Sequence, residues 1–295
     1  MRASRRACAA LFDLDGTLLD TAPDLAAALN VLLHEEQRPP LELALIRPHV
    51  SSGAVAVVRT GFPGVSGEPF ERLRRRFLEL YRAALSVHTR LFPGFEAVLA
   101  TLESRGLPWG IVTNKAGWLT EPLLADLGLL ARAACVLSGD TLPERKPHPR
   151  PLLVAAGQLG VAPADCVFVG DALRDVQAAC AAGMVPLAVR YGYLDPADNP
   201  DAWPVAAWLD VPSDLLPWLQ LEGPLTRVER LAGVAPCVPV GCSRRPLSPP
   251  PAASDCSPGG WRGASARRSR PCRHSWAPAS RSSPTTPCAT TRTCS

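Results

Sequence analysis

Lysine is almost absent from this chain. Lys115 and Lys146 are the only two in 295 residues, and arginine supplies the remaining basic side chains. Long apolar runs are missing as well: no stretch of about 18 uncharged apolar residues occurs, so a membrane-spanning helix is not expected. The apolar run before Asp13 has about six residues, fewer than the roughly 7–15 of a signal-peptide core. The sequence therefore predicts a protein without a membrane segment.

Paired cysteine motifs are also absent. Residues 1–222 contain Cys8, Cys135, Cys166 and Cys180, and none of them belongs to a C-x-x-C pair. Three fall within or beside predicted strands and Cys180 on an apolar helix face, so we expect buried, reduced thiols. This pattern favours a cytoplasmic protein.

Positive charge is concentrated at the end of the chain. Residues 223–295 carry a net charge of +9, whereas residues 1–222 carry −5. The tail has twelve Pro and eleven Ser, no Phe, Tyr or Lys, and no helical or strand period, so it cannot form a core. Two interpretations stay open: a disordered basic tail that contacts nucleic acid or membrane, or a GC-rich gene read out of frame, which the composition favours.

Strand and helix patterns alternate through the rest of the chain. Short apolar runs predict strands at 9–12, 107–113, 134–138, 166–170 and 186–190, and helical periods predict helices at 94–105, 117–127, 150–159 and 173–181. Strands that alternate with helices are typical of an α/β fold with a doubly wound parallel sheet.

Residues 21–90 show helical patterns only. A helix start is indicated by Thr21, with Pro and Asp in the first turn. A second amphipathic segment follows Pro69, with apolar residues at helical spacing and a solvated arginine face; its apolar residues are Phe70, Leu73, Phe77, Tyr81 and Ala84. We predict a helical cap at 21–90, a core formed by 1–20 and 91–222, and a separate tail at 223–295.

Polar side chains stand at the carboxyl ends of the predicted strands. They are Asp13 and Asp15 after the first strand, Thr113 and Asn114 at the end of the second, and Asp171 and Asp175 after 166–170; Lys146 precedes a helix. Each alone also fits an acidic turn, a helix cap or a surface lysine. A calcium loop is not expected, because the positions that such a loop fills with its third oxygen ligand, a glycine and a glutamate hold Thr17, Leu18 and Asp24.

The segment Phe12-Asp13-Leu14-Asp15-Gly16-Thr17-Leu18 resembles the first motif of phosphatases of the haloacid dehalogenase superfamily. The segments around Thr113, Lys146 and Asp171 match its other three motifs in order. The resemblance covers residues 7–220 and implies the strand order 3-2-1-4-5, with the aspartates meeting at the topological switch point. Clustered carboxylates need a counter-charge, and Mg²⁺ with oxygen ligands suits them.

The resemblance also implies a role for each residue. Asp13 would be the nucleophile that becomes an aspartyl-phosphate, and Asp15 the general acid and base. The phosphoryl oxygens would be held by Thr113, Asn114 and Lys146. The metal ligands would be Asp13, Asp15 through its carbonyl, and Asp171, with Asp175 behind them. An acid at Asp15 is typical of phosphatases and phosphomutases and is lacking in the dehalogenases, whereas Ala172 departs from the polar residue common after the fourth-motif Asp.

The cap resembles that of phosphoglycolate-phosphatase-like members, and the segments 112–115 and 188–193 resemble bacterial N-acetylmuramic acid 6-phosphate phosphatases. Both substrates are small phosphomonoesters with a carboxylate, which Arg47 or Arg190 could bind; the choice between them stays open. Ser52 and Gly53 lie in the cap loop expected to reach the site. The alternatives are a sugar phosphomutase and, more remotely, a protein that binds nucleic acid through its basic tail.

Overall fold

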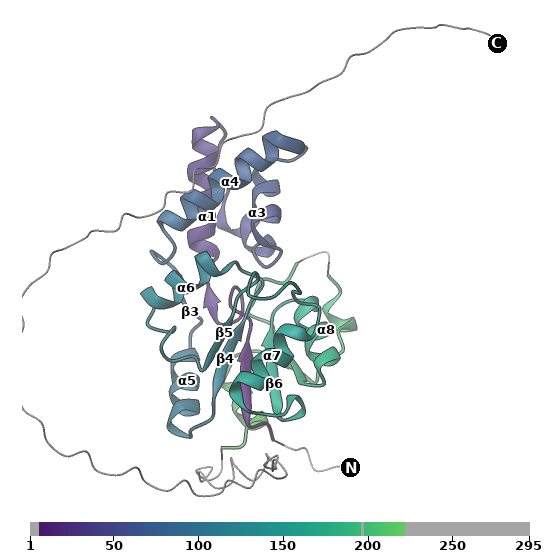
Figure 1. The fold of residues 1–295 in the computed structure, drawn as a ribbon. Helices are drawn as coiled ribbons and strands as arrows, with labels where there is room; N and C mark the ends of the chain where they lie inside the picture. Colours follow the sequence, from purple (N-terminus) through teal and green to yellow (C-terminus); the bar gives the residue numbers. More distant parts are fainter. Residues whose placement is uncertain (1–5, 196–197, 222–295) are drawn as a thin grey trace, which may run out of the picture. The chain divides into compact units, whose positions relative to one another are not determined.

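A six-stranded parallel sheet forms the centre of the computed structural model, which describes residues 6–195 and 198–221 (Figure 1). Its strands are β1 (Ala9–Phe12), β4 (Trp109–Val112), β5 (Cys135–Leu137), β6 (Cys166–Gly170), β7 (Val185–Val189) and β8 (Ala207–Leu209). The order is β5-β4-β1-β6-β7-β8, and every neighbouring pair is parallel. The predicted order of five strands is confirmed, and β8 is an additional edge strand that the sequence analysis missed.

Both faces of this sheet are covered, as the doubly wound prediction requires. Along β1, Ala10 and Phe12 pack in the larger apolar cluster, and Ala9 and Leu11 pack in a second one, because successive strand residues point to opposite faces. Helices α5 (Phe95–Ser104) and α6 (Gly117–Asp126) contribute to the first cluster, and α7 (Arg150–Leu159) and α8 (Leu173–Ala182) to the second. The strands are thus buried on both faces.

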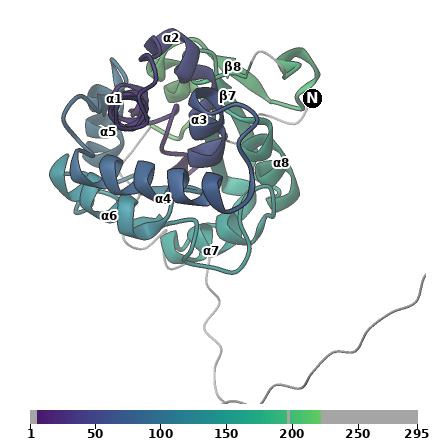
Figure 2. The ribbon, with the colours of Figure 1, turned by 90° about the horizontal axis from the view of Figure 1, so that it is seen from above.

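The chain between β2 (Leu19–Asp20) and β3 (Arg90–Leu91) forms the helical insert, residues 21–89. Its helices are α1 (Ala22–Glu35), α2 (Leu43–Ile46), the 3-10 turn η1 (Arg47–His49), α3 (Gly53–Gly61) and α4 (Gly67–Ala83); α1, α3 and α4 are visible together in Figures 1 and 2. The two short strands pair antiparallel where the chain leaves and returns, a pairing that the sequence analysis did not predict.

Helix α4 confirms the predicted amphipathic pattern. Phe70, Leu73, Phe77 and Tyr81 are buried, whereas Ala84 lies beyond the helix end and is exposed. The arginines on the other face form surface ion pairs; they are Arg72 with Glu36, Arg74 with Glu71, and Arg76 with Glu35 and Glu79. This run of arginines is therefore a solvated helix face, as predicted.

Several local predictions need correction. Cys135 and Cys166 are buried free thiols and Cys8 is half-buried, but Cys180 is exposed. It follows Val176 by one turn of α8, at the edge of the buried side of the helix. Thr21 precedes α1 as predicted, yet its side chain makes no capping hydrogen bond.

The remaining predictions concern the limits of the chain's parts. The described chain ends shortly after the 3-10 segment η4 (Pro212–Trp218); two further 3-10 turns are η2 (Pro163–Asp165) and η3 (Pro200–Ala202). Among the described residues, no helix has the length and apolar character to cross a membrane. The described residues all lie in one compact unit, so the division into core and cap stays a prediction. Both interpretations of the tail at 223–295 concern residues outside those described.

Candidate active site

The site lies where three neighbouring strands end. Since β4, β1 and β6 are adjacent and parallel, the residues that follow them meet at one edge of the sheet. Asp13 and Asp15 follow β1, Thr113 follows β4, and Asp171 follows β6. A cavity of about 510 Å³ adjoins this edge and is lined by Asp13, Asp15 and Thr113 from the core and by residues of α3 and α4 from the helical insert.

Three buried carboxylates gather at this edge. Asp13, Asp171 and Asp175 each offer an oxygen, and these oxygens lie within 4.8 Å of one another. The Lys146 ammonium lies between two of them, 2.8 Å from Asp13 Oδ1 and 2.7 Å from Asp175 Oδ1. Asp175, predicted to stand behind the metal ligands, is thus itself a member of the cluster.

Asp171 is the least compensated of the three. Its Oδ2 accepts hydrogen bonds from Ser51 Oγ at 2.5 Å and from the backbone N–H of Tyr193 at 2.9 Å. Its Oδ1 is buried and has no hydrogen-bond partner among the described residues. Burial, with the charges of Asp13 and Asp175, raises the pKa of Asp171 to about 7. Lys146 pairs with Asp13 and Asp175 and leaves Asp171 without a paired cation, so the cluster and its orphaned oxygen fit a divalent cation.

We expect the metal-free protein to lose stability between about pH 4 and pH 7. The folded state keeps the Asp171 proton in this window, above the usual pKa of 3.8, whereas the unfolded chain has lost it, so stability falls as the pH rises. Each pKa unit corresponds to about 1.4 kcal/mol. Unfolding by urea in EDTA at pH 5 and pH 7 measures the change.

Asp171→Asn provides the matched comparison, because an amide keeps the shape of the carboxyl and does not titrate. Relative to this variant, the wild type should lose on the order of 2 kcal/mol between pH 5 and pH 7. Equal pH dependence in the two proteins would show that Asp171 is already ionised at pH 5.

Gly16 allows the first loop to approach Asp171. Its φ is +86°, a left-handed conformation that favours glycine, and a Cβ there would collide with the carboxyl of Asp171 and the ring of Tyr193. The Gly after Asp15 in the first motif therefore has a steric role: it brings the loop after β1 against the acid that follows β6.

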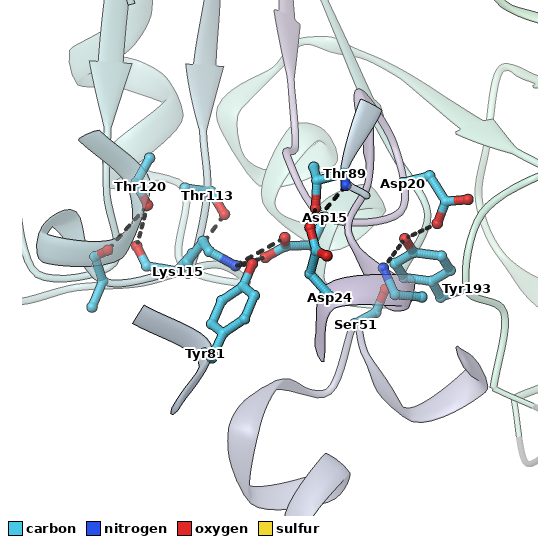
Figure 3. Close-up of polar contacts among 12 residues, drawn as sticks. Asp15, Asp20, Asp24, Ser51, Tyr81, Thr89, Thr113, Lys115, Thr120 and Tyr193 are labelled. Carbon is cyan, nitrogen blue, oxygen red and sulfur yellow. Dashed lines mark hydrogen bonds and ion pairs between the residues drawn. The ribbon is translucent and has the colours of Figure 1, made fainter. Parts of the chain in front are cut away.

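Asp15 is held apart from the carboxylate cluster. Lys115 Nζ lies 3.1 Å from Asp15 Oδ1 and 3.2 Å from Oδ2, and it donates to Tyr81 Oη at 2.9 Å (Figure 3). Burial alone would lower the pKa of Lys115, but Asp15 and Tyr81 outweigh it and raise the pKa. Burial raises the pKa of Tyr81 to about 12. Near neutral pH, Lys115 is therefore charged and Tyr81 is protonated.

The predicted phosphate-binding residues have different surroundings. Thr113 is buried and lines the cavity, and its Oγ1 accepts from the backbone N–H of Lys115 at 3.2 Å, so its own proton is left to donate. The Asn114 side chain instead binds the backbone of Lys146, with Nδ2 donating to its carbonyl at 2.9 Å and Oδ1 accepting from its N–H at 3.1 Å. The Asn114 side-chain amide therefore positions Lys146, and a role of Asn114 as a phosphate ligand stays a prediction.

The loop of the helical insert reaches the site, but through a different residue from those predicted. Ser51 contacts Asp171, and its carbonyl accepts from Arg174 Nη2 at 2.7 Å. Ser52 and Gly53 line the cavity as expected.

Neither arginine proposed for substrate lines this cavity. Arg47 pairs with Asp20 at 2.9 Å and stacks over the ring of Tyr193, and Arg190 pairs with Asp210 at 3.3 Å. Nearby acids therefore already hold both guanidinium groups, and a role of either arginine at the substrate carboxylate stays a prediction.

Sequence reasoning missed several residues of the cavity wall. The arginines that line it are Arg74, Arg145 and Arg174, and Trp118 and Tyr81 contribute aromatic surface. Arg145 and Arg174 belong to the third and fourth motifs, close in the chain to Lys146 and Asp171. Their place in the sequence could therefore have predicted that they line the site. Tyr81 gave no such signal, since a core tyrosine has the same helical spacing.

Comparisons with known proteins agree with this geometry. A profile of the haloacid dehalogenase-like hydrolases matches residues 10–189. Over 207 residues, 70% of this chain and 94% of the relative, the chain is 46% identical to a phosphoglycolate phosphatase of Xanthomonas campestris pv. campestris. Over 210 residues, 70% and 93% of the two chains, it is 44% identical to an N-acetylmuramic acid 6-phosphate phosphatase of Pseudomonas putida.

A solved structure resembles the fold over nearly its whole length. It is a predicted phosphoglycolate phosphatase from Haemophilus somnus 129pt, with a TM-score of 0.65 and 29% identity, and the match covers 72% of this chain and 97% of that one. The profile match spans more than half of the chain. The chain therefore belongs to the haloacid dehalogenase-like hydrolases.

Proposed function

We propose that the protein is a Mg²⁺-dependent phosphomonoesterase that acts on a small sugar-acid phosphate through an aspartyl-phosphate. The observation that carries this proposal is the buried cluster of Asp13, Asp171 and Asp175, bridged by Lys146 beside the cavity. Family membership and the names of the relatives support the reaction class, since those proteins are phosphatases of small phosphorylated compounds.

In the proposed first step, an oxygen of Asp13 attacks the phosphorus while the bond to the leaving alcohol breaks. Asp15 gives its proton to the departing oxygen. In the second step, Asp15 takes a proton from water as the water oxygen bonds to phosphorus and Asp13 is released. The Lys146 ammonium and the Thr113 hydroxyl are placed to offset charge on the phosphoryl oxygens.

Mg²⁺ would be held by Asp13 and Asp171 and by the carbonyl of Asp15, with Asp175 beside them. When bound, it supplies positive charge that lowers the repulsion between the phosphate and the carboxylates. Asp171 Oδ1 is the oxygen in this set that most needs a cation, because it is buried and unpaired among the described residues.

The cavity favours a substrate larger than a two-carbon acid. Its volume of about 510 Å³ lies within the roughly 300–1,000 Å³ of pockets that enclose drug-sized ligands. One part of the wall is apolar and aromatic, with Phe77, Leu78, Trp118 and Leu119. A sugar ring can pack on such a wall. We therefore propose N-acetylmuramic acid 6-phosphate as the substrate, and 2-phosphoglycolate as the second candidate because relatives carry that name.

Phosphate release from a panel of phosphomonoesters tests this assignment. The panel contains N-acetylmuramic acid 6-phosphate, 2-phosphoglycolate, glucose phosphates and nucleotides, each with Mg²⁺ and with EDTA. We expect the muramic acid phosphate to give the highest kcat/KM and EDTA to abolish activity. Conversion of one sugar phosphate isomer to another with little phosphate release would instead support the phosphomutase alternative.

Arg145 is the proposed contact for the substrate carboxylate. It lines the cavity, is exposed, and directly precedes Lys146. Replacing Arg145 by methionine should raise the KM for N-acetylmuramic acid 6-phosphate about tenfold, the loss expected for one charged hydrogen bond, and leave the KM for N-acetylglucosamine 6-phosphate unchanged.

Arg47→Met is the matched control for this prediction, because Arg47 is bound to Asp20 outside the cavity wall. A selective effect of Arg47→Met, with none for Arg145→Met, would exchange the two assignments.

The cytoplasmic location stays a prediction.

A further inference from the structure

Asp15 is held by two residues from different parts of the chain. Lys115 follows β4, and Tyr81 lies near the end of α4 in the helical insert. The Lys115 ammonium contacts both oxygens of Asp15 and the Tyr81 hydroxyl, and Figure 3 shows it between them. The Lys115 side chain is only 7% exposed and that of Asp15 17%. This is a buried ion pair that still opens to the cavity.

The arrangement restricts the Asp15 carboxyl. An ammonium has three donors, and two of its contacts here are the two oxygens of one carboxylate, so rotation of that carboxylate breaks them. A lysine side chain is flexible by itself, but the contact with Tyr81 fixes its end. The Tyr81 ring is in turn buried and stacked with Phe77, with ring centroids 6.4 Å apart. The orientation of Asp15 thus depends on the packing of α4.

We propose that Lys115 and Tyr81 are positioning residues that align Asp15 for proton transfer to the leaving alcohol, so that this step requires α4 of the helical insert in place. The inference rests on the role proposed above for Asp15. Lys115 and Tyr81 exchange no proton with the substrate. The ion pair is the ionised state of Asp15; in the reaction one Asp15 oxygen first takes a proton from water while the other keeps its contact with Lys115, and that proton then moves to the alcohol oxygen as the phosphorus–oxygen bond breaks.

The test uses two leaving groups. An alkyl phosphate such as glucose 6-phosphate needs a proton on its departing oxygen, whereas 4-nitrophenolate departs without one. Because kcat/KM reports the steps up to the first irreversible one, it isolates departure of the leaving group. We expect Tyr81→Phe to lower kcat/KM about tenfold for the alkyl phosphate and less than about twofold for 4-nitrophenyl phosphate. The tenfold loss is a part of the roughly 10²–10⁴-fold acceleration that general acid catalysis supplies.

Tyr191→Phe is the matched control. The Tyr191 hydroxyl is buried and has no hydrogen-bond partner among the described residues, and its ring packs on Phe92 and Phe95 outside the cavity wall. This variant should leave both values of kcat/KM unchanged. It separates the loss of the Tyr81–Lys115 contact from the general effect of removing a buried hydroxyl.

Asp15→Asn separates failure of this inference from failure of the proposed function. If Asp15→Asn lowers kcat/KM equally for the alkyl phosphate and for 4-nitrophenyl phosphate, the acid role of Asp15 is wrong. If Asp15→Asn is selective for the alkyl phosphate but Tyr81→Phe is unchanged or unselective, only the positioning inference is overturned. In the double variant, Tyr81→Phe should add no selective loss to that of Asp15→Asn, because both act on the same proton transfer; an additive loss would also overturn the inference.

Discussion

Replacing Asp13 by asparagine should abolish turnover while the protein stays folded. An amide cannot form the acyl phosphate, and the loss of a nucleophile in other covalent enzymes costs on the order of 10⁶-fold in kcat. We expect kcat to fall by at least about 10⁴-fold, allowing for the residual catalysis that such sites retain. Phosphate release from N-acetylmuramic acid 6-phosphate with Mg²⁺ measures it.

The fold should survive because asparagine keeps the volume of the buried side chain. Lys146 loses one of its two partners but keeps Asp175 at 2.7 Å, and the cluster loses one of three mutually repelling charges. Urea unfolding should give a midpoint close to that of the wild type. A folded Asp13→Asn protein with more than about a hundredth of the wild-type kcat would contradict covalent catalysis by this residue.

Replacing Lys146 by methionine should give the largest loss of stability. The ammonium is about 1% exposed and is the ion-pair partner of both Asp13 and Asp175. Without it, buried carboxylates remain without a counter-charge, and removing one partner of a buried ion pair typically costs about 3–5 kcal/mol. The free energy of unfolding, measured in EDTA at pH 7, should fall by that amount. Mg²⁺ should restore part of the loss.

Arg72→Met is the control for charge removal as such. Arg72 pairs with Glu36 on the surface of α4, where its side chain is 57% exposed, and exposed ion pairs contribute about 1 kcal/mol or less. If Lys146→Met were no more destabilising than Arg72→Met, Asp13 and Asp175 could not both be ionised beside Lys146. The electrostatic argument for a cation in this site would then fail.

The order of the sheet and its active edge could be predicted because they depend on local patterns. Apolar runs that end in Asp13, Thr113 or Asp171 show where each strand stops, and parallel strands bring those ends to one edge. Strand β8 was missed because only the 3-10 turn η3, and no predicted helix, separates it from β7, so the alternation of strands and helices did not indicate it. The β2–β3 pairing involves two residues on each side, which is too few to show a strand period.

The directions of loop side chains could not be predicted in the same way. Arg47 and Arg190 stand near the site in the chain, yet Asp20 and Asp210 bind them, and these partners are set by tertiary packing. Asn114 follows β4 as its motif requires, but its amide is used to hold Lys146. Tyr81 has the helical spacing of a core residue, and its ring is buried in the core. Its hydroxyl also contacts Lys115, because tertiary packing brings α4 to that lysine.

The most direct test of the central claim is to find the phosphoryl group on Asp13. Asp15→Asn should form the aspartyl-phosphate from 4-nitrophenyl phosphate, because this leaving group needs no acid, and should hydrolyse it slowly without a base. Acid quenching followed by peptide mass spectrometry should then reveal one phosphoryl group on the peptide that contains Asp13, sensitive to hydroxylamine. Release of 4-nitrophenol by this variant with no phosphoryl group on that peptide, or with the group on another residue, would contradict the account.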